Sequence, residues 1–248
     1  MSAVYRSGKG TQVVVRKGAR ELHIDGTFAS YYEPGQVSTG SVWDALGAAL
    51  LVLPPRRRRS VLLLGLGGGS AARLARALAP RAHIQAVEID PNVVRLARQW
   101  FDLDALDVEV TVADARQVVA RSRRRFDAVL EDVFVGDGRD AAKPDGLPEP
   151  GLIHAARRLS PGGVLASNAL DEAPEVAQVM TGLFPRLVRI EIEGYDNQVF
   201  VGSRAGLDAR RMRAAVARDP VLTRTLPRLR FRTISGRIIR TGTARRSC

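Results

Sequence analysis

VLLLGLGGGSAARLARALAPRAHIQAVEID, residues 61–90, decides the fold of this chain. The apolar run at 61–64 predicts a buried parallel strand. Glycines follow at 65–69, and the alanine, leucine and arginine content of residues 71–79 predicts a helix. A second apolar strand is expected at 84–87. Strand, glycine turn, helix and strand in this order form half of a nucleotide-binding unit.

The glycine turn and the acid after the second strand indicate what this unit binds. Glycine lets the backbone pass close to a ligand. Glu88 ends the second strand about twenty residues after the turn, where an acid can bind both hydroxyls of a ribose. The pattern therefore predicts a nucleotide or nucleoside ligand. The alternative is a tight structural turn between strand and helix.

Length and composition indicate one large domain, or one large and one small domain: the chain has 248 residues, 45% hydrophobic and 26% charged. No apolar run is long enough to span a membrane, so no membrane partner is expected. The first ten residues, MSAVYRSGKG, contain no apolar signal region, which favours a cytoplasmic location. The single cysteine, Cys248, excludes an internal disulfide, and three separated histidines argue against a zinc site, so no metal is expected.

The chain is strongly basic, with a formal net charge of +12 and a pI near 11.1. Such a charge can mark an anionic partner such as nucleic acid. Nearly all of the basic residues are arginines in an alanine-rich chain, however, as genome composition bias can produce. Nucleic acid is therefore a partner that the sequence allows but does not favour. The four arginines at 56–59 fit a solvated link better than a phosphate-binding patch.

Residues 1–40 are predicted to form a small antiparallel β element before the main domain. Residues 1–10 have the character of a frayed end, and Asp25-Gly26 is a strong hairpin signal. The expected strands cover residues 11–16, 21–24 and 27–32. The element either helps to form an acceptor pocket beside the nucleotide site or only covers one edge of the sheet.

Residues 41–205 are predicted to form the main domain, in which strands and helices alternate after a helix at 41–53. Strands are expected at 107–112, 126–130, 164–168, 187–192 and 198–201, and helices at 92–101, 116–121, 152–159 and 172–183. Five βα units followed by an antiparallel hairpin predict the α/β, Rossmann-like, seven-stranded sheet of class I S-adenosylmethionine enzymes, rather than a six-stranded dinucleotide fold. Residues 206–248 are a basic helix and tail that either pack along the domain or bind an acidic partner.

Two further acids stand at predicted strand ends. Asp114 follows the strand at 107–112 and precedes a helix, so it can accept a hydrogen bond from an adenine amino group, cap the helix, or do both. Asp132 follows the strand at 126–130. Because ligands of open parallel sheets bind beyond the carboxyl ends of the strands, Asp132 is placed to meet the group that the nucleotide carries.

GLGGGS at 65–70, AVEIDP at 86–91 and the strand-end Asp132 together resemble the spermidine synthase (polyamine aminopropyltransferase) family. The likeness covers roughly residues 11–203 and includes the segments IDGTFAS, ADA and LSPGGVL. GLGGGS, AVEIDP and QWF also look like the methyltransferase branch of this superfamily, which modifies protein N-termini. The resemblance implies S-adenosylmethionine or decarboxylated S-adenosylmethionine as the donor. It also implies a homodimer, because family members often pair.

The resemblance carries the family's donor-binding roles onto the residues of these motifs. The positions that it implies are Gly65, Gly67, Gly68, Gly69, Glu88, Ile89, Asp114, Ala115 and Asp132.

The chain departs from this family where the family holds amines. Aminopropyltransferases usually read GGGDGG, whose aspartate helps to hold the free amine of the donor, and the corresponding residue here is Gly68. Their strand-end motif has two acids three residues apart, whereas Val-Phe-Val follows Asp132. Their tyrosine motif in the N-terminal helix is replaced by Trp-Asp-Ala at 43–45. The acids left for a locally acidic pocket are Asp44, Glu131, Asp132 and Asp137.

Both kinds of transfer are in-line displacements at a sulfonium carbon, in which the enzyme mainly aligns donor and acceptor. Asp132 is the candidate catalytic residue because an acid can orient or deprotonate an amine acceptor. The alternative is that Asp132 binds the donor or caps a loop without proton transfer. Acceptor contacts are expected at Tyr31, Trp43, Asp44 and Tyr195, although each of these side chains can instead serve packing.

Three functions follow from these residues. The first is methyl transfer from S-adenosylmethionine to a small-molecule amine or a protein amine, which the missing acid at Gly68 favours. The second is polyamine aminopropyl transfer from decarboxylated S-adenosylmethionine with rearranged acids. The third is a non-catalytic protein that binds a nucleoside or nucleic acid.

Overall fold

The structure, a computed structural model, describes residues 2–7, 10–136 and 141–235. Its strands are β1 Ser2–Ser7, β2 Thr11–Arg16, β3 Ala19–Ile24, β4 Thr27–Tyr32, β5 Ser60–Leu64, β6 His83–Glu88, β7 Val108–Val112, β8 Phe126–Glu131, β9 Val135–Gly136, β10 Ala141–Ala142, β11 Leu159–Ala169, β12 Arg186–Ile192, β13 Gln198–Ser203 and β14 Leu229–Ser235. Its α-helices are α1 Val42–Gly47, α2 Ser70–Leu78, α3 Pro91–Trp100, α4 Ala115–Arg121, α5 Leu152–Arg157, α6 Ala173–Leu183 and α7 Ala209–Arg218.

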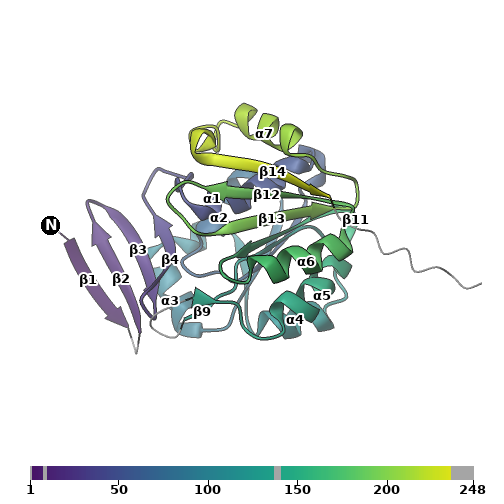
Figure 1. Ribbon diagram of the computed structural model, residues 1–248. Coiled ribbons are helices and arrows are strands. Elements are labelled where there is room, and N and C mark those ends of the chain that lie inside the picture. Colours follow the sequence, from purple (N-terminus) through teal and green to yellow (C-terminus); the bar gives the residue numbers. More distant parts are fainter. Residues whose placement is uncertain (1, 8–9, 137–140, 236–248) are drawn as a thin grey trace, which may run out of the picture.

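One large mixed sheet forms the centre of the molecule, in the order β14-β12-β13-β11-β8-β5-β6-β7 (Figure 1). The strands from β11 to β7 run parallel, and β13, β12 and β14 add antiparallel pairings at one end. The inner parallel strands β5 and β8 are covered on both faces, which explains their nearly continuous apolar runs, whereas the edge strand β7 has no buried residue. The core beside α1, α2 and α7 covers one face, and the core beside α4, α5 and α6 covers the other. The expected α/β fold is confirmed.

A separate four-stranded antiparallel sheet, β1-β2-β3-β4, stands beside the large sheet (Figure 1). The antiparallel element was expected. The prediction of a frayed end was wrong for residues 2–7, because they form β1. These residues pair along their whole length with β2, from Ser2 opposite Arg16 to Ser7 opposite Thr11. Apolar side chains of this sheet, including Val13 and Leu22, pack against α3.

The region after residue 205 adds to the large sheet. In β14, Leu229 is fully buried and Phe231 packs against the same core, which explains why this segment pairs with β12 from Leu229 opposite Ile192 to Ser235 opposite Arg186. This eighth strand was not predicted, because its alternating arginines hid the pattern. Of the two alternatives for this region, residues up to 235 pack along the domain, and residues 236–248 lie outside the described part. The division at residues 40 and 205 stays a prediction.

The helix expected at 41–53 changes character half-way. α1 ends at Gly47, and Ala48–Val52 continues as a tighter 3-10 helix before Pro54. Both parts are largely buried against the sheet, so the segment keeps the packing role that its apolar face predicted. Within the described residues, no helix has the length and apolar character to cross a membrane.

Candidate active site

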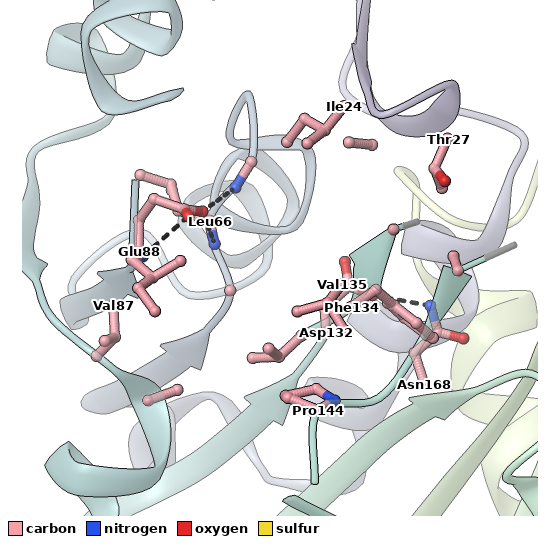
Figure 2. Close-up of a pocket in the computed structure, with 18 of the residues that line it drawn as sticks. Ile24, Thr27, Leu66, Val87, Glu88, Asp132, Phe134, Val135, Pro144 and Asn168 are labelled. Carbon is pink, nitrogen blue, oxygen red and sulfur yellow. Dashed lines mark hydrogen bonds between the residues drawn. The ribbon is translucent and has the colours of Figure 1, made fainter. Parts of the chain in front are cut away.

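A cavity of about 370 Å³ lies beyond the carboxyl ends of β5, β6 and β8, the position where ligands bind in open parallel sheets. Glu88 lies on one side and Asp132 on the other (Figure 2). The residues of the expected donor set that line it are Gly65, Gly67, Glu88, Ile89, Asp114, Ala115 and Asp132. Of the expected acceptor residues, Trp43 and Tyr195 line it. Gly68, Gly69, Tyr31 and Asp44 are not part of its wall.

The glycine turn is required by protein packing as much as by any ligand. A side-chain carbon at Gly65 would lie 2.4 Å from the carbonyl oxygen of Asp132, where the ends of β5 and β8 meet. At Gly68 it would lie 2.8 Å from Cβ of Ser30 in β4 and 2.9 Å from the ring of Phe101. The amide of Gly68 donates a hydrogen bond of 2.7 Å to the Ser30 hydroxyl. Gly68 therefore packs the turn against the small sheet and does not line the cavity, and its donor-binding role stays a prediction.

Glu88 is the acid at the end of β6, and backbone amides hold its carboxylate at the edge of the cavity. Oε2 accepts hydrogen bonds from the amides of Leu66 and Gly67 at 3.2 and 3.0 Å. Oε1 accepts from the amides of Ile89 and Asp90 at 2.9 and 3.2 Å. Figure 2 shows the first of these contacts joining β6 to the glycine turn. These four amides match the roughly four acceptor positions of a carboxylate, so they fix its orientation at the edge of the cavity.

Asp114 caps α4, as expected, by accepting from the amide of Arg116 at 2.8 Å. Its carboxylate also pairs with the Arg116 guanidinium at 2.6 Å. The hydrogen bonds from this side chain are the main reason why the pKa of Asp114 lies below its ordinary value. Arg116 lines the cavity and also donates to the carbonyl oxygen of Asp145 at 2.7 Å. Sequence reasoning missed Arg116, since its charge alone does not distinguish it from its exposed neighbours.

Asp132 lies between two neutral hydrogen-bond donors. Oδ2 accepts from the indole N–H of Trp43 at 2.9 Å, and Oδ1 accepts from Nδ2 of Asn168 at 2.8 Å. Nδ2 of Asn197 in turn donates to Oδ1 of Asn168 at 3.1 Å. These partners come from α1, β11 and the connection between β12 and β13. The donors orient the carboxylate but do not neutralise its negative charge.

Aromatic side chains surround this end of the cavity. The ring of Phe28 meets the Trp43 ring edge-on, with centroids 5.2 Å apart, and Phe134 and Tyr195 also line the wall. Figure 2 shows Phe134 beside Asp132 and Asn168. Phe28, Phe134, Asn168 and Asn197 were missed from the sequence. Asn168 had a usable signal, because it falls at the end of a predicted strand.

The other expected acids of the pocket do not face it. Asp44 is fully buried. Its carboxylate accepts hydrogen bonds from the Ser38 and Thr225 hydroxyls and from the hydroxyl and amide of Thr39. Asp44 therefore stabilises the preceding loop. Glu131 is also fully buried and pairs with Lys143. Asp137 lies outside the described residues. Within the described chain, Asp132 is thus the one member of this acidic group that lines the cavity.

Tyr31 lies outside the cavity as well. Its hydroxyl donates to Glu33 at 2.8 Å, and burial, strengthened by this carboxylate, raises the pKa of Tyr31 to about 12. Tyr31 thus does not line the cavity, and its contact with an acceptor stays a prediction.

Comparison with known proteins agrees with this geometry. A family model described as a methyltransferase domain matches residues 61–163. The eEF1A lysine and N-terminal methyltransferase of Danio rerio is 30% identical over 157 residues, which are 57% of this chain and 22% of that protein. A probable polyamine aminopropyl transferase of Bifidobacterium longum is 33% identical over 106 residues, which are 42% of this chain and 23% of that protein.

The chain is similar to class I S-adenosylmethionine-dependent methyltransferases and to spermidine-synthase-like transferases. Two solved structures extend this likeness over more of the chain. A probable spermidine synthase from Corynebacterium glutamicum matches 95% of this chain and 91% of its own, with a TM-score of 0.73 and 20% identity, which shows a shared fold. Human methyltransferase-like protein 13 in complex with SAH matches 76% of this chain and 93% of its own, with a TM-score of 0.62 and 26% identity.

Both groups of curated relatives are transferases, and the domain match supports a transferase. The chain nevertheless matches only about a fifth of the length of the two curated relatives named above.

Proposed function

We propose that this chain transfers a methyl group from S-adenosylmethionine to an amine acceptor. The observation that carries the proposal is the carboxylate of Asp132, which lines the cavity among aromatic side chains while Trp43 and Asn168 hold both of its oxygens. A negatively charged group with a fixed orientation suits a substrate that arrives as an ammonium ion.

The opposite side of the cavity suits an adenosyl donor. Glu88 lies at the cavity edge beside the turn at Gly65, where ribose hydroxyls would share its oxygens with the amides or replace the two amide contacts of 3.2 Å. Ile89 is 64% exposed at the same site, and a large apolar side chain left open to solvent there suits an aromatic base. The cavity volume of about 370 Å³ lies in the range of small-molecule sites, about 300–1,000 Å³. The SAH bound to human methyltransferase-like protein 13 supports the same class of donor.

When bound, S-adenosylmethionine supplies an electrophilic methyl carbon on its sulfonium. Asp132 accepts a hydrogen bond from the acceptor ammonium and takes a proton from it, which frees the nitrogen lone pair. The aromatic wall excludes water and directs the amine toward the donor side. In the balanced reaction the N–C bond forms, the C–S bond breaks with its electron pair on sulfur, and the proton passes from Asp132 to solvent.

Two features favour methyl transfer over aminopropyl transfer. The packing of Ser30 and Phe101 against Gly68 leaves no room for the acid that aminopropyltransferases carry at this position to bind the free amine of their donor. Lys143 also neutralises Glu131, so a polyamine would meet few open carboxylates among the described residues. Aminopropyl transfer remains the second candidate because of the sequence likeness to polyamine aminopropyl transferases.

Calorimetric titration with S-adenosylmethionine and with its decarboxylated form tests the donor. We expect the carboxylated donor to bind more tightly, and tighter binding of the decarboxylated form would refute methyl transfer. Turnover is then followed by mass spectrometry of SAH release with putrescine, spermidine and a short peptide that has a free N-terminus and a lysine.

The Asp132→Asn variant tests the proposed catalytic residue. Because proton transfer by a placed side chain contributes about 10²–10⁴-fold, turnover should fall by that order while the affinity for SAH stays within about twofold. Asp196→Asn is the matched control, since Asp196 is exposed on the connection beside Asn197 and does not line the cavity. Full turnover by the Asp132 variant would dismiss the proposed role.

A further inference from the structure

A fully buried ion pair lies directly behind the Asp132 end of the cavity. Nζ of Lys143 lies 2.7 and 2.8 Å from the two carboxylate oxygens of Glu131, the last residue of β8. Neither side chain has any exposed surface. The Ser167 hydroxyl and the amide of Val133 donate to the same carboxylate, so each charge is fully partnered.

Stability alone gives no reason for this pair. Removing two charges from water costs about as much as their attraction returns, and a pair of apolar residues in the same place is often equally stable. A buried ion pair does, however, require one geometry, because a displaced ammonium would leave the carboxylate unpaired in an apolar interior. The pair therefore fixes the position of the chain that carries Lys143.

The chain that carries Lys143 forms one wall of the cavity. Its lining residues are Val133, Phe134, Val135, Gly136, Ala141 and Pro144. Lys143 connects the two arms of this wall. It belongs to the arm at 141–144, and its Nζ lies 4.5 Å from the centre of the Phe134 ring and 3.5 Å from the carbonyl oxygen of Val133 in the arm at 133–136. A cation over an aromatic face is attractive, and more so when water is excluded.

The wall has a second and separate attachment on the donor side. The Arg116 guanidinium binds the carbonyl oxygen of Asp145 and the carboxylate of Asp114. Arg116 is partly exposed, whereas Lys143 is buried beside Phe134 at the Asp132 end. The two attachments therefore act on different ends of the same cavity.

We infer that Lys143 is a positioning residue that holds the Phe134 wall over Asp132 and so determines acceptor affinity, separately from donor affinity. This inference rests on the proposed function for its acceptor, but the position of the wall can be tested without any substrate. Lys143 does not touch the reacting atoms. It acts through Phe134 and Val133, which line the cavity.

The test compares Lys143→Met with the double variant Glu131→Gln/Lys143→Met. Methionine keeps most of the length of the lysine side chain and removes its charge. The double variant leaves no unpaired charge in the interior. The double variant should therefore fold and melt close to the wild type even if the single variant does not. Lys17→Met, at an exposed turn of the small sheet, is the matched control.

Three measurements are made on the full chain. Hydrogen exchange of residues 133–136 and 141–146 should become at least tenfold faster in both Lys143 variants and stay unchanged in the control. The dissociation constant for SAH, measured by calorimetry, should stay within twofold. With the amine of the panel that the wild type turns over best, KM should rise at least tenfold, with a smaller change in kcat.

The double variant shows whether Lys143 holds the cavity wall in position or only balances the charge of Glu131. A wild-type KM and wild-type exchange in this folded protein would overturn the inference, because charge balance would then be the pair's whole role. A raised KM with unchanged hydrogen exchange would also overturn the inference, because the wall would then not have moved. If the wild type binds no SAH, the proposed function fails, and the exchange measurement still decides whether Lys143 holds the wall.

Discussion

Replacing Gly68 by alanine tests whether the glycine turn is shaped by the small sheet. Gly68 does not adopt a positive φ, so an alanine suits its backbone, and any cost must come from contacts. The added carbon would lie 2.8 Å from Cβ of Ser30 and 2.9 and 3.0 Å from two ring carbons of Phe101. Ser30 is 1% exposed and Phe101 is fully buried, so neither side chain can move into solvent.

The magnitude follows from two opposing terms. Inserting a carbon into a packed interior costs about 1–3 kcal/mol. Alanine restricts the unfolded chain more than glycine does, which stabilises the protein by about 0.4–1 kcal/mol. Gly68→Ala should therefore lower the free energy of unfolding by about 1–2 kcal/mol. For a chain of this size that corresponds to a fall in Tm of about 2–8 °C.

Urea and thermal unfolding, followed by circular dichroism, measure this change. The slope of unfolding free energy against urea should stay constant, since the variant alters stability and not the surface exposed. The control is Gly182→Ala in α6, where no atom lies within 4 Å of the added carbon. There alanine should stabilise the helix by up to about 1 kcal/mol. A Gly68 variant that melts at or above the wild type would refute the packing argument.

Two further predictions concern Tyr31 and Asp44, which do not line the cavity. Tyr31→Phe should remove a component near pH 12 from the ultraviolet titration of the four tyrosines. Folding raises the pKa of Tyr31, so the neutral phenol stabilises the folded protein fully below pH 10. This contribution to stability is lost as the pH rises through about 12. If Tyr31→Phe removes no component near pH 12, the contact of Tyr31 with Glu33 is absent. Asp44→Asn should lower the free energy of unfolding by about 2–4 kcal/mol in urea, because the amide turns a nitrogen toward buried donors, while SAH affinity stays within twofold. A stable Asp44 variant that no longer binds amine would return this residue to the acceptor site.

Much of the donor side could be read from local patterns. Apolar runs bounded by turns predict buried strands, and the carboxyl ends of parallel strands meet at one edge of a sheet. Glu88 and Asp132 were therefore placed at that edge by sequence position alone, and the structure brings both to one cavity. Their roles toward a ligand remain predictions.

The acceptor side could not be read in this way, because the direction of an acid depends on distant partners. Asp44 and Asp132 were both expected in an acidic acceptor pocket. The first accepts from Thr225, 181 residues away, whereas the second accepts from Trp43 and Asn168. Burial decides between the two roles, since a carboxylate enclosed by donors has no free face for a substrate.

The sequence by itself determined the order of the βα units, the glycine turn and the acids at the strand ends, since these depend on periodicity and turn chemistry within a few residues. Only the tertiary structure decided that Gly68 packs on Ser30, that β14 completes the sheet edge, and that Lys143 closes on Glu131. Each of these contacts joins segments whose local patterns are independent. They exist because folding brings the segments together, where close packing and the cost of an unpaired buried charge select one arrangement.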